Sequence, residues 1–162
     1  MREVWDLYRG SGEKAGITVL RGDPIPEGLY HLSVSTWIRN GTGQYLLSQR
    51  HPDKQYPLLW ECTGGCALSG EDSLQTAVRE VGEELGVALD PGGGALIYRE
   101  RREQPQDFYD VWLFQADFDL GSCILQKEEV VAARWALKEQ IAELFRQGKL
   151  HPLLSYFAEV IP

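Results

Sequence analysis

The segment from Gly65 to Val87 constrains the fold of this chain most, because it predicts an amphipathic helix that ends at a glycine. It reads GCALSGEDSLQTAVREVGEELGV. Acidic residues at Glu71-Asp72-Ser73 suit the positive end of a helix dipole, and Gly86 is a suitable stop. One apolar stripe recurs between them at helical spacing, formed by Leu74, Ala77, Val78, Val81 and Leu85. The segment therefore predicts a helix that packs on one side.

Another side of the same helix carries a row of carboxylates. At about 100° per residue, Glu80, Glu83 and Glu84 fall within about 100° of arc, because spacings of three and four residues share a helical face. Most acidic helix faces are simply solvated. Carboxylates this close repel one another, however, and their oxygens are the ligands that Mg²⁺ and Mn²⁺ prefer. Arg79 can orient one of them bidentately and offset the repulsion.

Composition excludes several classes of protein. With 162 residues, 43% hydrophobic and 25% charged, the chain suits one domain with a real core. A net charge of −8 argues against binding a nucleic acid polymer or an anionic membrane, both of which favour basic surfaces. No apolar run has the length of a membrane span or a signal peptide. We therefore expect no membrane association and a cytoplasmic location.

The cysteines do not predict a disulfide framework or a metal centre. Cys62, Cys66 and Cys123 are few and odd in number, which does not suit a disulfide-rich secreted fold. Cys62 and Cys66 lack the second Cys or His pair that a structural zinc site needs. Buried or idle thiols are the better interpretation.

The order of predicted elements indicates the fold class. A hairpin of Val4–Tyr8 and Ile17–Leu20 comes first, and a second helix is expected over Leu137–Gln147, with a short one over Pro152–Glu159. Strands are predicted at Tyr30–Arg39, Gln44–Gln49, Leu58–Cys62, Ala95–Arg101, Tyr109–Phe118 and Arg134–Ala136. This predicts an α/β fold: a mixed β-sheet sandwiched between α-helices, with an N-terminal β-hairpin. We expect a single domain, 1–162, with residues 1–29 as a hairpin and loop extension and 30–147 as its core.

The complete pattern in the helix segment resembles the Nudix box. At average residue usage, a random match in this chain has a chance of roughly one in ten million. The resemblance, together with the order of elements, implies the Nudix fold and a Nudix hydrolase. Every defined position of the box is matched, by Gly65, Glu71, Arg79, Glu80, Val81, Glu83, Glu84, Gly86 and Val87.

The resemblance also implies roles for individual residues. The metal ligands would be Glu80, Glu83, Glu84 and the backbone carbonyl of Gly65, holding Mg²⁺ with Mn²⁺ as the alternative. In the motif, Glu71 and Gly86 would be structural and Arg79 the orienting arginine. The family often adds an acid from a loop before a tryptophan-bearing strand. That acid would be Glu129, with Glu128 as its competitor.

The implied reaction is hydrolysis of a diphosphate linkage in a small molecule, a nucleoside diphosphate derivative or a related organic diphosphate. A bound cation neutralises the linkage and lowers the pKa of water, and a carboxylate accepts the proton. The catalytic candidates are Arg79, Glu80, Glu83 and Glu129, of which Glu80 and Glu129 are the first choices for the general base. Further candidates for the base are Glu103, Asp107 and Asp110.

Substrate contacts are predicted at a few residues. Arg50, at the end of a strand, can meet a phosphate, and Trp60 and Tyr109 can stack on a flat group. Trp37, Tyr45 and Trp112 could stack likewise, and Arg99, Arg101 and Arg102 could bind phosphate, although strand aromatics are usually core. His31, His51 and His151 are expected to be satisfied or exposed side chains.

Two alternative functions stay open at this point. Tyr30–Asn40 and Trp60 resemble isopentenyl-diphosphate isomerase and its hydrolase relatives. That isomerase keeps only the glutamate equivalent to Glu84, however, whereas this chain has the whole row. The other alternative is a non-catalytic Nudix-fold ligand-binding module, although such modules commonly lose these glutamates. A homodimer built through the N-terminal hairpin is a further expectation.

Overall fold

The computed structural model describes all residues, 1–162. Its helices are α1 (Ser73–Leu85), α2 (Lys138–Arg146) and α3 (Phe157–Val160), with short 3₁₀ turns at Pro91–Gly93, Leu120–Ser122 and Pro152–Leu154. Its strands are β1 (Val4–Arg9), β2 (Lys14–Leu20), β3 (Leu29–Arg39), β4 (Tyr45–Arg50), β5 (Trp60–Glu61), β6 (Thr63–Cys66), β7 (Gly94–Arg102), β8 (Asp107–Gln115) and β9 (Val130–Ala136). No helix has the length and apolar character that crossing a membrane requires.

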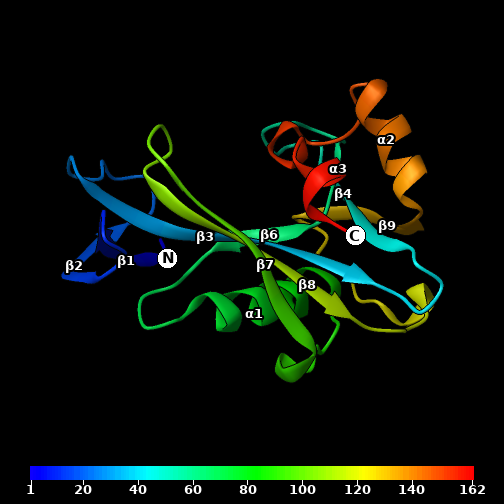
Figure 1. The fold of residues 1–162 in the computed structure, drawn as a ribbon, viewed down its shortest axis with the longest axis horizontal. Helices are drawn as coiled ribbons and strands as arrows, with labels where there is room; N and C mark the ends of the chain where they lie inside the picture. Colours follow the sequence, from blue (N-terminus) through cyan, green and yellow to red (C-terminus); the bar gives the residue numbers. More distant parts are fainter.

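Strand β3 organises the sheet (Figure 1). It pairs in parallel with β8 along His31–Arg39 and antiparallel with β6, while β7 adds to the far side of β8. Strands β3 and β4 pair next to their turn, at Arg39 and Tyr45, and β4 then pairs antiparallel with β9 and β5. The mixed sheet predicted from the order of elements is therefore confirmed.

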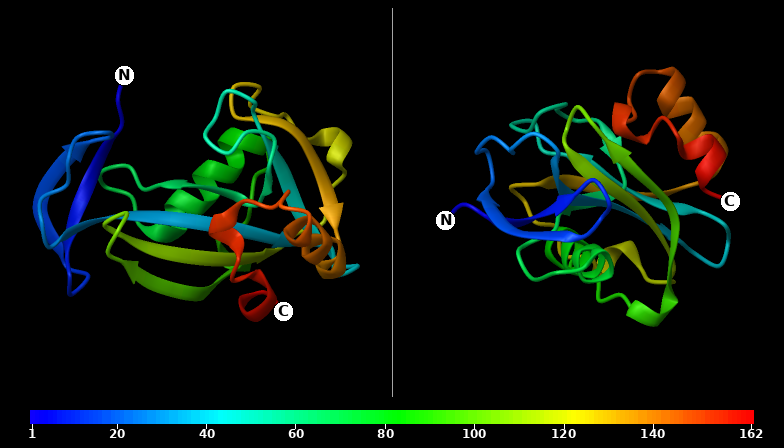
Figure 2. Two further views of the ribbon diagram at one scale, coloured as in Figure 1. Left: turned by 90° about the horizontal axis from the view of Figure 1, so that it is seen from above. Right: turned by 60° about the vertical axis from the view of Figure 1, so that its left-hand side comes forward.

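Helices cover both faces of this sheet. Side chains alternate along β3, so Trp37 packs into one core and Val34 and Ile38 into the other. The first core includes Ile141 and Leu144 of α2 and Phe157 of α3, and the second includes Ala77, Val81 and Leu85 of α1. Figures 1 and 2 show α1 on one side of the sheet and α2 and α3 on the other. This is the predicted sandwich.

The predicted N-terminal hairpin is also present. Strands β1 and β2 pair antiparallel, and β1 continues onto the start of β3 through Tyr8↔Tyr30 and Arg9↔Leu29. The hairpin therefore extends the sheet at one end of the molecule, where Figure 2 shows it standing apart from α2 and α3. The homodimer expected through it stays a prediction.

Several predicted element boundaries were wrong. The predicted strand Leu58–Cys62 is the shorter β5, and a separate strand, β6, runs through the two glycines that follow. Those glycines read as a strand end, but antiparallel pairing of Val34 with Gly65 and Ser35 with Gly64 holds them extended. Strand β9 begins at Val130, since its pairing with β4 supplies hydrogen bonds that its sequence alone does not announce. The predicted last helix is a 3₁₀ turn followed by α3.

Candidate active site

Helix α1 is held by strong signals at both ends. Asp72 is its N-cap and accepts a hydrogen bond from the Gln75 amide at 2.8 Å, and the Gln75 side chain accepts one from the Asp72 amide at 2.9 Å. This capping box starts the helix at Ser73, so Glu71 lies before it. Gly86 ends the helix in the left-handed conformation, at φ 66°. A Cβ there would lie 2.8 Å from the Cβ of Ile124, so both space and conformation require glycine.

Arg79 connects the helix to the strand and loop before it. Its guanidinium donates to both carboxylate oxygens of Glu71, at 2.7 and 3.0 Å, and to the carbonyl of Cys66 at 3.0 Å. Burial alone would raise the pKa of Glu71, but hydrogen bonds from Arg79, the Leu68 amide and Thr76 lower it. Glu71 is thus an ionised brace, and Arg79 fixes α1 relative to β6.

The three glutamates of α1, Glu80, Glu83 and Glu84, differ in how far they are exposed to solvent. The Glu83 side chain is 53% exposed and that of Glu80 13%, whereas Glu84 as a residue is 5% exposed. Glu84 falls on the buried side of the helix with Val81 and Ala77, three and seven residues earlier respectively. The separation of a packing side from a carboxylate side, predicted from the helical wheel, is therefore incomplete, and one carboxylate is inserted into the protein.

These glutamates line a cleft of about 500 Å³, here called the acidic cleft. It lies between β6, α1, the N-terminal segment, the segment after β4 and the segment before β9. Its lining residues are Glu3, Arg21, Arg50, Lys54, Gln55, Gly64, Gly65, Cys66, Glu80, Glu83, Glu84, Gln126 and Glu129. The three box glutamates, Gly65 and the proposed extra acid Glu129 thus come together, while Glu128 is exposed and does not line the cleft.

Gly65 is a close-approach position. A Cβ built there would lie 2.1 Å from Oε1 of Glu80, so any side chain would displace that carboxylate. Its φ is not in the left-handed region, and space alone therefore requires glycine. Strand β6 brings the backbone of Gly65 against the carboxylate of Glu80.

The acidic cleft disfavours negative charge at its deeper positions. Burial raises the pKa of Glu80 to about 7, although Arg79 acts in the opposite direction. Burial likewise raises the pKa of Glu84 to about 8, Lys54 opposes the rise, and Glu61, Glu80 and Glu129 add to it. Buried acids surrounded by other acids are an environment in which a bound cation would be stabilising.

The side chains as they stand do not surround a metal position. No three His, Cys, Asp or Glu side chains are arranged to hold an ion, and Arg79 donates to Glu80 at 2.9 Å and Glu83 at 3.0 Å instead. The donor set nevertheless fits a hard divalent cation, because carboxylates and the Gly65 backbone meet in one cleft. Joint ligation would require Glu80 and Glu83 to turn away from the guanidinium.

Two positively charged side chains from outside the Nudix-box segment, Lys54 and Arg50, also line the acidic cleft. Lys54 forms an ion pair with Glu129, and its side chain is 23% exposed. Nη1 of Arg50 lies 2.8 Å from both carboxylate oxygens of Glu61, and its Nε donates to the carbonyl of Gln55. Sequence analysis missed Lys54 and Glu61, since a lysine in a polar loop and a glutamate in a short strand carry no local signal of a site.

A second cleft of about 280 Å³ adjoins the first and is here called the histidine cleft. The two clefts share Arg50, Gly64, Gly65 and Cys66. The remaining lining residues are His31, Ser33, Val34, Ser35, Glu61, Cys62, Arg102, Pro105, Asp107, Tyr109, His151, Leu153 and Leu154. Predicted substrate residues Arg50 and Tyr109 therefore line it.

The other predicted contacts are distributed differently. Tyr109 is 2% exposed and donates to Ser35 at 2.6 Å, so most of it is core, and Trp37 and Tyr45 are core as well. Trp60 lines neither cleft and packs beneath the Arg134 guanidinium, 4.5 Å from its ring centroid. Trp112 lies near the start of α1 and donates to Ser73. Of the aromatic candidates, Tyr109 alone reaches either cleft.

The alternative general bases lie outside the acidic cleft. Asp107 and Asp110 are 1% and 0% exposed, and each is bound by a neighbouring arginine, Arg102 and Arg99 respectively. Glu103 accepts hydrogen bonds from Tyr30 and Arg101. None of these three lines the acidic cleft, whose carboxylates are Glu80, Glu83, Glu84 and Glu129, together with Glu3 of the N-terminal segment.

The remaining histidines and cysteines have structural surroundings. His31 is buried and stacks on Trp5, with ring centroids 4.5 Å apart, but its Nδ1 has no hydrogen-bond partner, so the prediction of a satisfied or exposed side chain was wrong for it. His151 accepts from the Leu153 amide. His51 faces Asp53, with Nδ1 3.6 Å from its carboxylate. Cys62, Cys66 and Cys123 are free thiols, and burial raises the pKa of Cys66 to about 12.

Comparison with known proteins identifies the family. The NUDIX domain model matches residues 29–156, which include the glutamate row, Gly65 and Glu129. The chain belongs to the Nudix superfamily. An uncharacterized Nudix hydrolase of Listeria monocytogenes is 38% identical over 152 residues, covering 93% of this chain and 89% of that relative. These matches make the protein a Nudix hydrolase, of the pyrophosphohydrolase type.

Solved structures agree with the Nudix fold. The crystal structure of DR0079 from Deinococcus radiodurans matches with a TM-score of 0.78 at 22% identity, covering 99% of this chain and 100% of that one. The NUDIX domain of Shewanella oneidensis NrtR, solved as a complex with ADP ribose, matches with a TM-score of 0.59 at 17% identity, covering 76% and 82%. At these identities the likeness concerns the fold.

Proposed function

We propose that this Nudix hydrolase cleaves a diphosphate linkage in a nucleoside diphosphate derivative or a related organic diphosphate, with Mg²⁺ or, alternatively, Mn²⁺. The observation that carries the proposal is the acidic cleft, in which Glu80, Glu83, Glu84, Gly65 and Glu129 lie together. The structurally similar NUDIX domain of NrtR was solved as a complex with ADP ribose, a molecule with such a linkage. A bound divalent cation would neutralise the phosphates and acidify a water molecule.

The protein's own residues divide the work by position. Arg79 holds Glu71 and Glu80 and so fixes the helix against β6. Arg50 and Lys54 lie on the cleft wall, where their charges favour the anionic substrate. Water adds to one phosphorus, its proton passes to a carboxylate, and the leaving phosphate takes the electron pair of the broken P–O bond. Glu129 and Glu80 are the proposed acceptors of that proton.

Two observations favour hydrolysis over the alternatives. Isomerisation of an alkene needs an acid placed to protonate carbon, and burial makes the Cys62 and Cys66 thiols weaker acids by raising the pKa of each. A pure binding module has no need of several carboxylates in one cleft, because their mutual repulsion would destabilise the fold with no bound cation to offset it. The intact row is explained by metal-assisted chemistry.

Glu83→Gln tests the proposal with little risk to folding, because the Glu83 side chain is 53% exposed. Across a panel of organic diphosphates with Mg²⁺ and Mn²⁺, we expect the variant to lose about 10²-fold in activity. Glu139→Gln, an exposed glutamate at the start of α2 and far from the box in sequence, is the matched control.

A second readout follows the metal directly. Titration of Mn²⁺ followed by electron paramagnetic resonance should show binding by the wild type and weaker binding by Glu83→Gln. Equal Mn²⁺ binding by the two proteins, or full activity of the variant, would contradict the proposed site. Proton exchange into isopentenyl diphosphate would support the isomerase instead.

A further inference from the structure

The N-terminal hairpin forms part of the wall of the acidic cleft. The family match begins at residue 29, so the hairpin lies outside the matched region. Glu3 and Arg21, which flank the hairpin strands, nevertheless line the acidic cleft together with Gly65 and Glu80. An element beyond the family domain therefore contributes charged groups to the candidate active site.

The hairpin is fixed in this position by hydrogen bonds to the loop before α1. The Ser69 amide donates to the Val4 carbonyl at 2.7 Å, and Asp6 accepts from the Ser69 hydroxyl at 2.7 Å and the Gly70 amide at 2.9 Å. The Arg21 amide donates to the carbonyl of Glu3 at 2.9 Å, which ties the two ends of the hairpin together. These hydrogen bonds fix the backbone of Arg21 relative to the loop before α1.

The charged groups at the hairpin ends lie beside the box residues. Arg21 and Glu3 line the acidic cleft together with Gly65 and Cys66 of β6 and Glu80 of α1. They are therefore placed to act electrostatically on a ligand bound there.

Arg21 has donors to spare. A guanidinium has five N–H donors, and that of Arg21 makes a single ion-pair contact, from Nη1 to Glu3 at 3.1 Å. Its side chain is 61% exposed. Arg50, in contrast, is 13% exposed and committed to Glu61 and Gln55. Arg21 is therefore the arginine of the cleft that is free to bind an incoming phosphate bidentately.

The two clefts differ in what they can accept. Apart from its glycines and Cys66, the acidic cleft is lined by charged and amide side chains. The histidine cleft is mixed, because rings and aliphatic groups such as His31, Tyr109 and Leu154 line it together with the charged residues Arg50, Glu61, Arg102 and Asp107. An organic group therefore suits the histidine cleft and a chain of phosphates suits the acidic cleft, with Arg50 at their junction.

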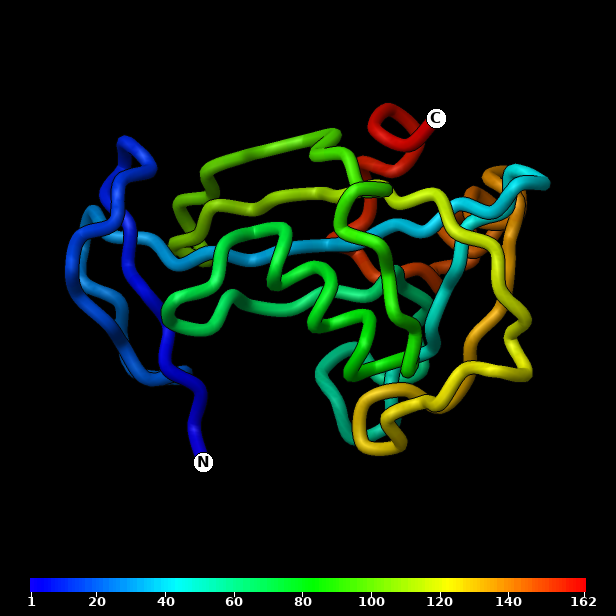
Figure 3. Tube along the Cα trace, turned by 90° about the horizontal axis from the view of Figure 1, so that it is seen from below, coloured from blue at the N-terminus to red at the C-terminus, as the bar shows by residue number.

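Lys54 and Arg21 line the acidic cleft from two different segments of the chain. Lys54 belongs to the segment between β4 and β5 and pairs with Glu129. Figure 3 shows the N-terminal hairpin at the left and the segment between β4 and β5 nearer the centre, well separated from it. A phosphate chain that reaches from the box glutamates toward Arg21 would leave the junction with the histidine cleft to its organic end.

We propose that Arg21 is a specificity-determining residue of the substrate site and that the enzyme prefers polyphosphates esterified at one end only. The free terminal phosphate binds at Arg21, and the organic group occupies the histidine cleft. A substrate capped at both ends would place its second organic group against the charged lining of the acidic cleft. This inference rests on the proposed function and names the class of substrate within it.

Matched substrate pairs test this proposal. ADP and ADP-ribose, UDP and UDP-glucose, and CDP and CDP-choline differ in whether the terminal phosphate is free. We expect the wild type to have the higher kcat/KM for the uncapped member of a pair. Arg21→Gln should lower this preference about tenfold, mainly by raising KM for the uncapped member, because one charge-assisted contact is lost. Arg21→Lys should recover part of it.

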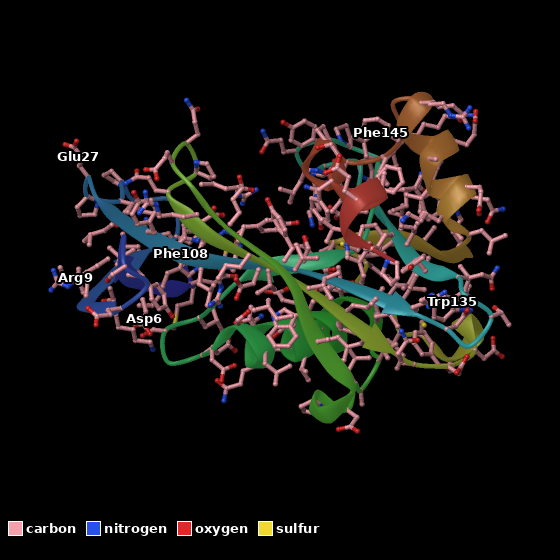
Figure 4. All side chains as sticks on the ribbon, in the orientation of Figure 1. Asp6, Arg9, Glu27, Phe108, Trp135 and Phe145 are labelled. Atoms are coloured by element: carbon pink, nitrogen blue, oxygen red, sulfur yellow. The ribbon has the colours of Figure 1, made fainter.

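Arg9→Gln is the matched control. Arg9 is an exposed arginine of the same hairpin, lines neither cleft and points outward at the edge of the molecule (Figure 4). The control should keep the wild-type preference. Binding of inorganic tripolyphosphate with Mg²⁺, followed by calorimetry, should weaken about tenfold in Arg21→Gln and stay unchanged in Arg9→Gln.

The possible outcomes distinguish a failure of the inference about Arg21 from a failure of the proposed hydrolase function. A wild type that prefers the capped members, or an Arg21→Gln variant with unchanged preference and unchanged tripolyphosphate binding, overturns the inference about Arg21 while hydrolysis that depends on Glu83 stands. A wild type that cleaves neither member of any pair and binds neither metal nor tripolyphosphate overturns the proposed function as well.

Discussion

The acidic cleft and the histidine cleft share a wall but differ in how completely their buried carboxylates are paired. In the histidine cleft, Asp107 is bound by both Arg102 and Ser33, and Glu61 by Arg50. In the acidic cleft, Glu84 is buried without a hydrogen-bonded cation. Fully paired carboxylates hold strands together, whereas incompletely compensated ones are left available for a ligand. Carboxylates are thus paired in the histidine cleft, whereas the acidic cleft leaves one buried carboxylate, that of Glu84, for which we propose a functional role.

The largest effect on stability is expected from breaking a pair in the histidine cleft. Asp107→Asn should lower the free energy of unfolding by about 3 kcal/mol, because a carboxylate that is 1% exposed leaves Arg102 without its partner. Urea unfolding measures it. Glu83→Gln is the same kind of change in the acidic cleft and should stay within about 0.5 kcal/mol of wild type. Equal destabilisation by both substitutions would remove the distinction between the clefts.

Gly65→Ala probes the wall that both clefts share. Its Cβ would lie 2.1 Å from Oε1 of Glu80, so the carboxylate must move. Displacement by about 1 Å costs on the order of 10²-fold in activity, and we expect a loss of that size in kcat/KM with the fold retained by circular dichroism. Gly93→Ala is the control, because the nearest atom to a Cβ there is 3.8 Å away. Wild-type activity in Gly65→Ala would show that the position of Glu80 is not critical.

Glu84→Gln should raise the free energy of unfolding, whereas Asp107→Asn should lower it. In EDTA at pH 8 to 9 we expect the variant to be more stable than wild type by about 1 kcal/mol, since burial and neighbouring acids disfavour the Glu84 carboxylate. Added Mg²⁺ should then stabilise the wild type more than the variant, measured as a shift in Tm. A variant less stable than wild type in EDTA would mean that the buried carboxylate is compensated after all.

Much of the fold was predictable because its signals are local. The α1 stripe of Ala77, Val81 and Leu85 follows helical spacing and packs as expected. The helix end at Gly86 was predictable because glycine readily adopts the left-handed conformation in which this residue ends α1. The boundaries that were wrong, at β6 and β9, depend on pairing with distant strands, which a single segment does not encode.

The candidate site divides along the same line. Local spacing on one helix put Glu80, Glu83 and Glu84 within one arc, but only the packed structure shows that Glu84, next to Ala77 and Val81, is the one that is buried. The resemblance already favoured Glu129 over Glu128 as the extra acid, and the path of the segment before β9 is consistent with that proposal, because it exposes Glu128 and brings Glu129 to Lys54. Trp60 was predicted to contact substrate, yet pairing of β5 with β4 places it outside both clefts.

The sequence by itself determined the amphipathic helix, its glycine stop and the carboxylate row, because these depend on contacts within a few residues, whose geometry the backbone fixes. Only the tertiary structure decided which acids are compensated, and that Glu3, Arg21 and Lys54 join the cleft. Those three lie far from the box in the chain and reach it through strand pairing and loop closure. Their charges act through distance and burial, which exist only in the folded molecule.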